Sequence, residues 1–140
     1  MTLTQRLLDI GVFEVAVSDT VGVAHPGQVK AMLPQLLEAI PAKSVALHFH
    51  DTCGMALANV LAALEFGLTT FDASAGDLGG CPYAPRATGN LATEDLVYML
   101  NGLGIETGID VDAVSDAALA LAPVLGHALP SRYTQARPAR

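Results

Sequence analysis

Two histidines at the end of an apolar run are the residues of this 140-residue chain best suited to chemistry. His48 and His50 close the apolar residues 44–47, a pattern that predicts a β-strand. Side chains alternate across a strand, so both imidazoles are expected on one face. Two neutral imidazoles on one face are half of a divalent-metal site. The pair alone also fits two histidines without any ligand role.

Acidic residues stand where each of three predicted strands ends. Asp19, Asp51 and Asp72 follow or close apolar stretches at residues 13–18, 44–49 and 68–73. In parallel β/α folds the carboxyl ends of the strands carry the active site. These carboxylates are candidates either for hydrogen-bonding residues at that end of the sheet or for groups that fix imidazole tautomers.

The three strands alternate with segments of helical periodicity. Helices are predicted over residues 26–39 and 54–66, the second with Leu57, Val60, Leu61 and Leu64 inward. Pro34 predicts that the first helix is kinked or starts late. This alternation predicts a parallel α/β sheet with right-handed crossovers. A (β/α)8 barrel fits better than a doubly wound sheet, because no glycine-rich phosphate turn follows the first strand.

The second half of the chain is predicted to be helical. Thr93, followed by two acids, is expected to cap a helix through residue 100, and Asp110 is expected to cap a helix over residues 111–121. Residues 1–121 are therefore expected to form a partial barrel domain. Residues 122–140 are basic and polar, and we expect a disordered tail there.

Composition excludes several classes of function. The chain is 51% hydrophobic and carries a net charge of −7, and its basic residues before residue 130 are scattered singly, so we expect no nucleic-acid binding. No window reaches the ~18 apolar residues that a membrane span needs. Two cysteines and no apolar leader predict a soluble cytoplasmic protein with reduced thiols.

Several motifs together resemble the C-terminal half of 3-hydroxy-3-methylglutaryl-CoA lyase. The resemblance runs from about residue 8 to residue 114. It is carried by SDTVG at residues 18–22, HFHD at 48–51, DAS at 72–74, GGCPYA at 79–84 and TGNLATED at 88–95. The H-x-H-D motif is shared with isopropylmalate and homocitrate synthases, whereas the last two motifs are typical of the lyases. A related acyl-CoA-condensing synthase is therefore the less favoured alternative.

The resemblance implies about three β/α units from the C-terminal part of a TIM barrel that binds Mg²⁺ or Mn²⁺. Such an enzyme cleaves the substrate 3-hydroxy-3-methylglutaryl-CoA, an acyl-CoA, to acetyl-CoA and acetoacetate. By the same resemblance His48, His50 and Asn90 match the metal ligands, and Cys81 matches the reactive cysteine on the glycine-rich loop. His48 is also a candidate for proton transfer.

The remaining candidates have alternative readings. Glu94 joins Asp19, Asp51 and Asp72 as a candidate for a carboxylate behind the metal ligands or at the barrel mouth. By composition alone Cys81 also fits a packed small residue, and Asn90 a helix cap or turn residue. Cys53 is expected to be an accessible thiol without a catalytic task.

The family's N-terminal strands carry an arginine–acid pair that has no counterpart before residue 13. We therefore expect the isolated chain to be inactive and to need a complementary N-terminal half. The alternative is a non-catalytic half-barrel that self-associates through its open strand edges.

Overall fold

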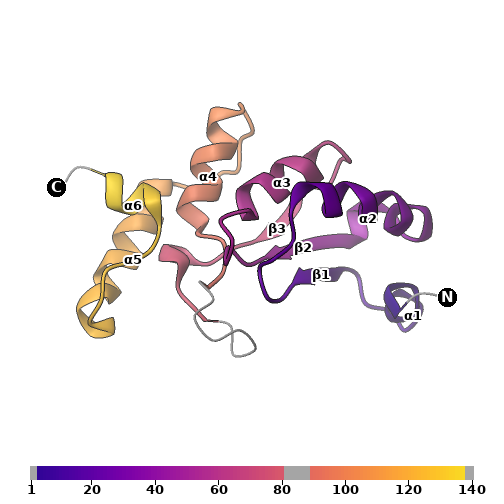
Figure 1. The fold of residues 1–140 in the computed structure, drawn as a ribbon, viewed down its shortest axis with the longest axis horizontal. Helices are drawn as coiled ribbons and strands as arrows, with labels where there is room; N and C mark the ends of the chain where they lie inside the picture. The colour runs from indigo at the N-terminus through magenta and orange to yellow at the C-terminus, as the bar shows by residue number, and fades with distance from the viewer. Residues whose placement is uncertain (1–2, 81–88, 138–140) are drawn as a thin grey trace. The chain divides into compact units, whose positions relative to one another are not determined.

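The computed structural model describes residues 3–80 and 89–137, and it divides into two compact units. The first unit spans Met1–Asp72 and the second spans Ala73–Arg140. Figure 1 shows the elements of both units.

A three-stranded parallel sheet forms the centre of the first unit. Its strands are β1 (Val15–Asp19), β2 (Val45–Phe49) and β3 (Thr70–Asp72), in the spatial order β1-β2-β3. All three strands and their parallel pairing agree with the sequence prediction. The helices of this unit are α1 (Leu3–Asp9), α2 (Pro26–Ala39) and α3 (Ala56–Leu64), and a 3-10 turn, η1 (Ala42–Ser44), precedes β2.

The two faces of the sheet differ in chemistry. Val45, Leu47 and Phe49 of β2 share one face of the strand and are buried. Figure 1 shows α2 and α3 lying beside the sheet. On the other face Ser18 of β1, His48 of β2 and Asp72 of β3 lie in one row across the sheet. The strand alternation therefore directs apolar residues into the core and leaves polar ones on the opposite face.

The helices of the first unit differ from prediction in two details. α2 begins at Pro26 and continues past Pro34, so the expected late start is wrong. In α3 the buried apolar residues are Val60 and small side chains, whereas Leu61 is 45% exposed. Leu57, Leu61 and Leu64 are not the buried face; small residues allow a helix to approach a sheet more closely than leucines do.

The described residues of the second unit, 73–80 and 89–137, form a short 3-10 turn and three α-helices. They are η2 (Ala75–Asp77), α4 (Thr93–Gly102), α5 (Val111–Leu125) and α6 (Arg132–Ala136). Asp110 caps α5 as predicted, since its side chain accepts hydrogen bonds from the amides of Asp112 and Ala113 at 3.0 and 3.1 Å. Thr93 is not a cap: Ala92 takes that position without a side-chain bond, and the Thr93 amide donates to the Ser74 carbonyl.

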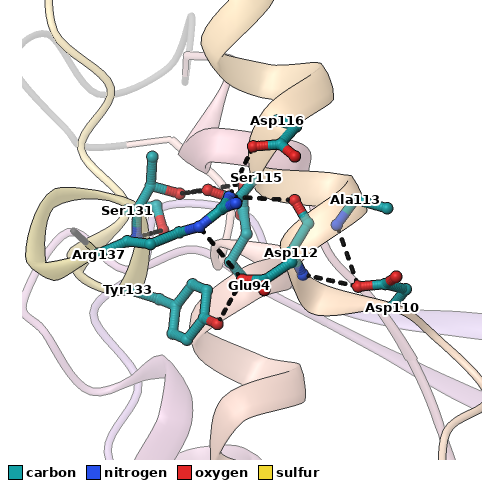
Figure 2. A network of polar contacts seen from close by, with 10 residues as sticks. Glu94, Asp110, Asp112, Ala113, Ser115, Asp116, Ser131, Tyr133 and Arg137 are labelled. Atoms are coloured by element: carbon teal, nitrogen blue, oxygen red, sulfur yellow. Dashed lines mark hydrogen bonds and ion pairs between the residues drawn. The ribbon is translucent and has the colours of Figure 1, made fainter. Parts of the chain in front are cut away.

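The C-terminal residues fold, and the expectation of a disordered tail is wrong for residues 122–137. Helix α5 continues to Leu125, and α6 forms beyond it. Leu129, Ser131 and Thr134 are buried. Arg137 pairs with Asp112 and Asp116 of α5 at 3.2 and 2.8 Å (Figure 2). The positive charge of Arg137 therefore offsets the negative charges of Asp112 and Asp116.

Among residues 3–80 and 89–137, we find no helix with the length and apolarity that a bilayer crossing requires.

Candidate active site

The two histidines lie together where β2 ends. Their ring centroids are 4.8 Å apart, in an edge-to-face arrangement with 64° between the ring planes. This confirms that both imidazoles are on one side of the strand. His50 is 8% exposed, while the His48 side chain is 24% exposed. One ring is therefore embedded in the fold, and the other borders solvent.

Asp72 holds the His48 ring. The Nδ1 atom of His48 lies 2.5 Å from Oδ1 of Asp72, and the two residues are paired in the β2–β3 register. A carboxylate at Nδ1 favours the tautomer with its proton on that nitrogen, which leaves the Nε2 lone pair available. Asp72 thus makes the contact expected of a carboxylate that orients a metal-binding or proton-transferring imidazole.

Asp19 and Asp51 bond to loop backbones instead. The Asp19 carboxylate accepts hydrogen bonds from the amides of Gly22, Val23 and Ala24 at 3.0–3.3 Å. Asp51 accepts one from the amide of Ala56, the first residue of α3, at 2.8 Å. Within the described residues these two carboxylates shape the loops that follow β1 and β2. Any further role of either in catalysis stays a prediction.

The loops after β1 and β2 pack closely at Gly22. This residue has a φ of +68°, and a Cβ placed on it would lie 2.5 Å from Thr52 Oγ1 and 2.9 Å from His50 Cβ. The Gly22 carbonyl also accepts a hydrogen bond from the Cys53 amide at 3.2 Å. This contact was not predicted from the sequence, although a glycine just after a strand that ends in Asp-Thr was a signal for it.

Asn59 is a second residue that sequence reasoning missed. It is fully buried in α3, and its side-chain nitrogen donates to the Ala24 carbonyl at 3.0 Å. It thereby fastens the loop after β1 to the helix after β2. A buried Asn within an apolar helix was the available signal. Cys53 is exposed, which agrees with its expected accessibility.

In the second unit, Asn90 and Glu94 have defined partners. Asn90 Nδ2 donates to the Leu78 carbonyl at 3.2 Å, which leaves its Oδ1 as the atom able to bind a cation. The Glu94 carboxylate is fully buried, and both its oxygens accept from the Gly76 amide, at 2.9 and 2.8 Å. Cys81 lies outside the described residues.

The donor types fit a divalent cation. The candidate donors are the Nε2 atom of His48, the ring of His50 and the amide oxygen of Asn90. Mn²⁺ accepts all three types of ligand, and Mg²⁺ accepts the oxygen most readily. No three His, Cys, Asp or Glu side chains gather into a metal-binding group within residues 3–80 and 89–137. The predicted set therefore depends on the Asn90 amide. The convergence of His48, His50 and Asn90 on one ion stays a prediction.

Comparison with known proteins supports the resemblance to hydroxymethylglutaryl-CoA lyases that the motifs indicate. The chain is 49% identical over 133 residues to the hydroxymethylglutaryl-CoA lyase YngG of Bacillus subtilis, a match that covers 95% of this chain and 44% of the relative. It is 44% identical over 134 residues to the mitochondrial lyase of Gallus gallus, covering 96% of this chain and 45% of the relative. The chain thus spans a little under half the length of the curated relatives it matches.

Solved structures of HMG-CoA lyases also match this chain. The crystal structure of the Bacillus subtilis HMG-CoA lyase matches with a TM-score of 0.92 at 49% identity, covering 95% of this chain and 45% of that one. An HMG-CoA lyase from Acinetobacter baumannii, solved with coenzyme A and 3-methylmalate, matches with a TM-score of 0.89 at 43% identity, covering 99% and 47%. The expected part of a TIM barrel is confirmed as the fold class.

The family model described as HMGL-like matches residues 1–120, which include both histidines, Asp72, Asn90 and the glycine-rich loop between them. Motifs, fold and comparisons therefore agree, and the chain belongs to the HMGL-like family of lyases.

Proposed function

We propose that this chain provides the metal-binding part of a hydroxymethylglutaryl-CoA lyase. The reaction is the cleavage of 3-hydroxy-3-methylglutaryl-CoA to acetyl-CoA and acetoacetate. The observation that carries the proposal is the His48 ring, held by Asp72 at Nδ1 and placed beside His50. The identity of 49% to a lyase that bears this name supports the choice of substrate.

The proposed chemistry is a retro-aldol cleavage. A Mg²⁺ or Mn²⁺ ion held by His48, His50 and Asn90 would polarise the substrate's hydroxyl oxygen. The hydroxyl proton passes to a base, a role open to His48 when His50 and Asn90 hold the ion without it. The electron pair of the broken carbon–carbon bond passes to the acetyl-CoA carbon, which then takes up a proton. We assign that final proton delivery to the thiol of Cys81. Asn90 is proposed only as a ligand of the metal ion, without a part in proton transfer.

His48 serves one role at a time. Its Nδ1 is committed to Asp72, so the single lone pair on Nε2 either binds the metal or accepts the hydroxyl proton. The His48 side chain is 24% exposed, so the ring borders solvent. Asp72 stabilises the protonated ring in the proton-transfer role and strengthens the donor nitrogen in the ligand role.

The decisive experiment is complementation. The chain should be mixed with the portion of the Bacillus subtilis lyase that lies outside the matched region, and acetoacetate release from 3-hydroxy-3-methylglutaryl-CoA should be followed. We expect no activity from the chain alone and measurable activity from the mixture. Activity of the isolated chain at rates of a complete enzyme would contradict the need for a partner, and no activity from any mixture would contradict the catalytic proposal.

A second candidate function is a non-catalytic half-barrel that self-associates. β1 and β3 each pair only with β2 in the described sheet, so each has an unpaired edge. A groove of about 310 Å³ also opens beside β1, lined by apolar residues that include Val17, Met32 and Phe49. Sedimentation of the purified chain would show dimers or larger species if this candidate holds, with no gain of activity in the mixture.

Metal affinity should be weak in the isolated chain. Two imidazoles and one amide supply no negative charge, and Mg²⁺ in particular loses its water reluctantly to such ligands. We expect at best millimolar binding of Mg²⁺ or Mn²⁺ in a calorimetric titration. Micromolar binding would show that a carboxylate joins the set.

Asp72 should strengthen metal binding in the mixture of this chain with the complementary portion of the lyase. Asp72→Ala removes the carboxylate that orients His48, and loss of such a partner typically weakens metal binding by about 10–100-fold. Electron paramagnetic resonance of bound Mn²⁺ measures this change. Glu65→Ala is the matched control, because Glu65 is an exposed carboxylate of the same unit that pairs with Lys30. An equal loss in both variants would argue against orientation by Asp72.

The proposed partner and setting follow from the same assignment. The substrate is an acyl-CoA, which the coenzyme A complex of the Acinetobacter baumannii relative supports. We place the protein in the cytoplasm, like the cytoplasmic lyases of Rattus norvegicus and Mus musculus that it matches, although four other matched relatives are mitochondrial.

A further inference from the structure

The first turn of α4 carries two adjacent acids that hold different segments of the second unit. Asp95 accepts hydrogen bonds from the Ser131 hydroxyl at 3.0 Å and from the amides of Arg132 and Tyr133 at 3.1 and 2.8 Å. The neighbouring acid, Glu94, points into the interior and is fully buried. Asp95 therefore fixes the start of α6 to the same helical turn that presents Glu94.

Glu94 joins the η2 turn to the C-terminal residues. Its two oxygens accept from the Gly76 amide at 2.9 and 2.8 Å, and the Thr134 hydroxyl lies 3.4 Å from one of them. Thr134 also bonds to the Ser115 hydroxyl at 3.0 Å. A Cβ placed on Gly76 would lie 3.1 Å from Leu129, so the turn is packed directly against the C-terminal segment.

The residue that follows the η2 turn holds the side chain of Asn90 by a hydrogen bond. Leu78 follows η2, and its amide donates to the Ala75 carbonyl at 3.1 Å. The Leu78 carbonyl accepts hydrogen bonds from Asn90 Nδ2 at 3.2 Å and from the Ser74 hydroxyl at 2.5 Å. This carbonyl decides which end of the Asn90 amide is left for a cation. A continuous series of contacts therefore connects Thr134, Glu94, Gly76, Leu78 and Asn90.

We propose that the C-terminal segment, residues 129–137, is a positioning element for the Asn90 side chain, acting through the buried carboxylate of Glu94. Its value for catalysis rests on the proposed ligand role of Asn90, while the series of contacts stands without it. Asn90 would hold the cation, whereas Thr134 and Glu94 act only through other residues.

Arg137 is the outer anchor of this segment. Its Nε lies 3.2 Å from Asp112 and its Nη1 lies 2.8 Å from Asp116, as Figure 2 shows. Nη1 also donates to the Asp112 carbonyl at 3.1 Å. The hydrogen bond to Asp116 raises the pKa of Arg137, so the guanidinium keeps its charge at any physiological pH. The Tyr133 hydroxyl donates to Asp112 beside it, at 2.9 Å.

The first test is amide hydrogen exchange on the intact chain. Thr134→Val removes the hydroxyl that bonds to Glu94 and Ser115 while keeping the side-chain volume. We expect the Gly76 and Leu78 amides to exchange about 10-fold faster, since protection reflects the stability of the local contacts. Thr134→Ser restores the hydroxyl and should restore protection. Unchanged exchange at Gly76 in Thr134→Val would overturn the proposal.

A matched pair of ion-pair variants tests the anchor. Arg137→Met should also accelerate exchange at Gly76, whereas Lys30→Met removes the exposed ion pair with Glu65 in the first unit and should leave Gly76 unchanged. An equal effect of both would indicate general destabilisation and would count against the proposal. Circular dichroism of each variant confirms that the helices remain.

The second test reads out Asn90 itself. The side-chain amide protons of Asn90 give their own nuclear magnetic resonance signals, and in Thr134→Val these should shift and lose protection while Thr134→Ser resembles the wild type. In the complemented protein, Mn²⁺ affinity should fall by about 10-fold in Thr134→Val, the size expected when the support of a metal ligand is lost. Faster exchange at Gly76 with unaltered Asn90 signals would overturn the positioning role.

The lyase function and the positioning role of the C-terminal segment can be refuted independently. If the wild-type mixture binds no Mn²⁺, the proposed lyase function fails, and the Asn90 amide signals still decide whether the C-terminal segment positions that side chain. If Mn²⁺ binds equally well in the wild type and in Thr134→Val, the positioning inference fails and the lyase function stands.

Discussion

Replacing His48 with alanine should abolish the activity that complementation restores, with a loss of about 10³–10⁶-fold in kcat. The substitution removes a nitrogen proposed either to bind the metal or to accept the hydroxyl proton, and it leaves the Asp72 carboxylate without its 2.5 Å partner. Catalytic groups that act as a unit lose nearly all of their effect together, so His48→Ala and Cys81→Ala should be similarly inactive. Steady-state release of acetoacetate measures the loss.

Cys53→Ala is the control for this experiment. Cys53 is an exposed thiol on the loop after His50, and no catalytic role is assigned to it. Its substitution should leave kcat unchanged. Substantial residual activity in His48→Ala would remove the histidine from the proposed mechanism, and a loss in Cys53→Ala equal to that in Cys81→Ala would remove the assignment of the thiol.

Gly22→Ala should produce the largest loss of stability in the first unit, about 2–5 kcal/mol. A left-handed backbone at a residue with a Cβ costs about 1–2 kcal/mol. Overpacking adds about 1–3 kcal/mol, because the new methyl group would lie 2.5 Å from Thr52 Oγ1 and 2.9 Å from His50 Cβ. Relief of this contact requires the His50 loop to move, so metal binding should weaken as well.

Gly54→Ala separates the two contributions. Gly54 has a nearly identical φ of +69°, but nothing lies within 4 Å of a Cβ placed there. Its substitution should cost only the backbone part, about 1–2 kcal/mol. Urea denaturation of the chain measures both variants. Equal losses would mean that the contact between the two loops contributes nothing.

The sheet could be predicted because its signals are local. Apolar runs ending in acids or histidines marked each strand, and the alternation of β2 alone placed His48 and His50 on one face. The contact between His48 and Asp72 follows from the parallel register, which the sequence did not supply. The sequence therefore singled out these acids as a group, but it could not show that Asp72 contacts an imidazole whereas Asp19 and Asp51 contact loop amides.

Contacts between distant residues account for the errors. Asp95 looks like an acid in the first turn of a helix, yet its partners are a hydroxyl and amides 36–38 residues later in the chain. The polar composition of residues 131–137 predicted disorder, because nothing local shows that Asp95, Asp112 and Asp116 will satisfy their donors. In α3, hydrophobicity favoured the leucines, while close packing on the sheet selected Ala56, Ala62 and Ala63.

The strand order β1-β2-β3 has a consequence for how the chain is made. β2 pairs with β1 and β3 pairs with β2, and each of these pairings closes a loop that contains one α-helix. Loop closure over such separations is slow unless the intervening segment is already compact, so formation of α2 and α3 should precede strand pairing. The sheet can thus grow one strand at a time as the chain leaves the ribosome. The row of Ser18, His48 and Asp72 is completed only when β3 arrives, so the histidine is the last of the site's groups in this unit to acquire its orientation.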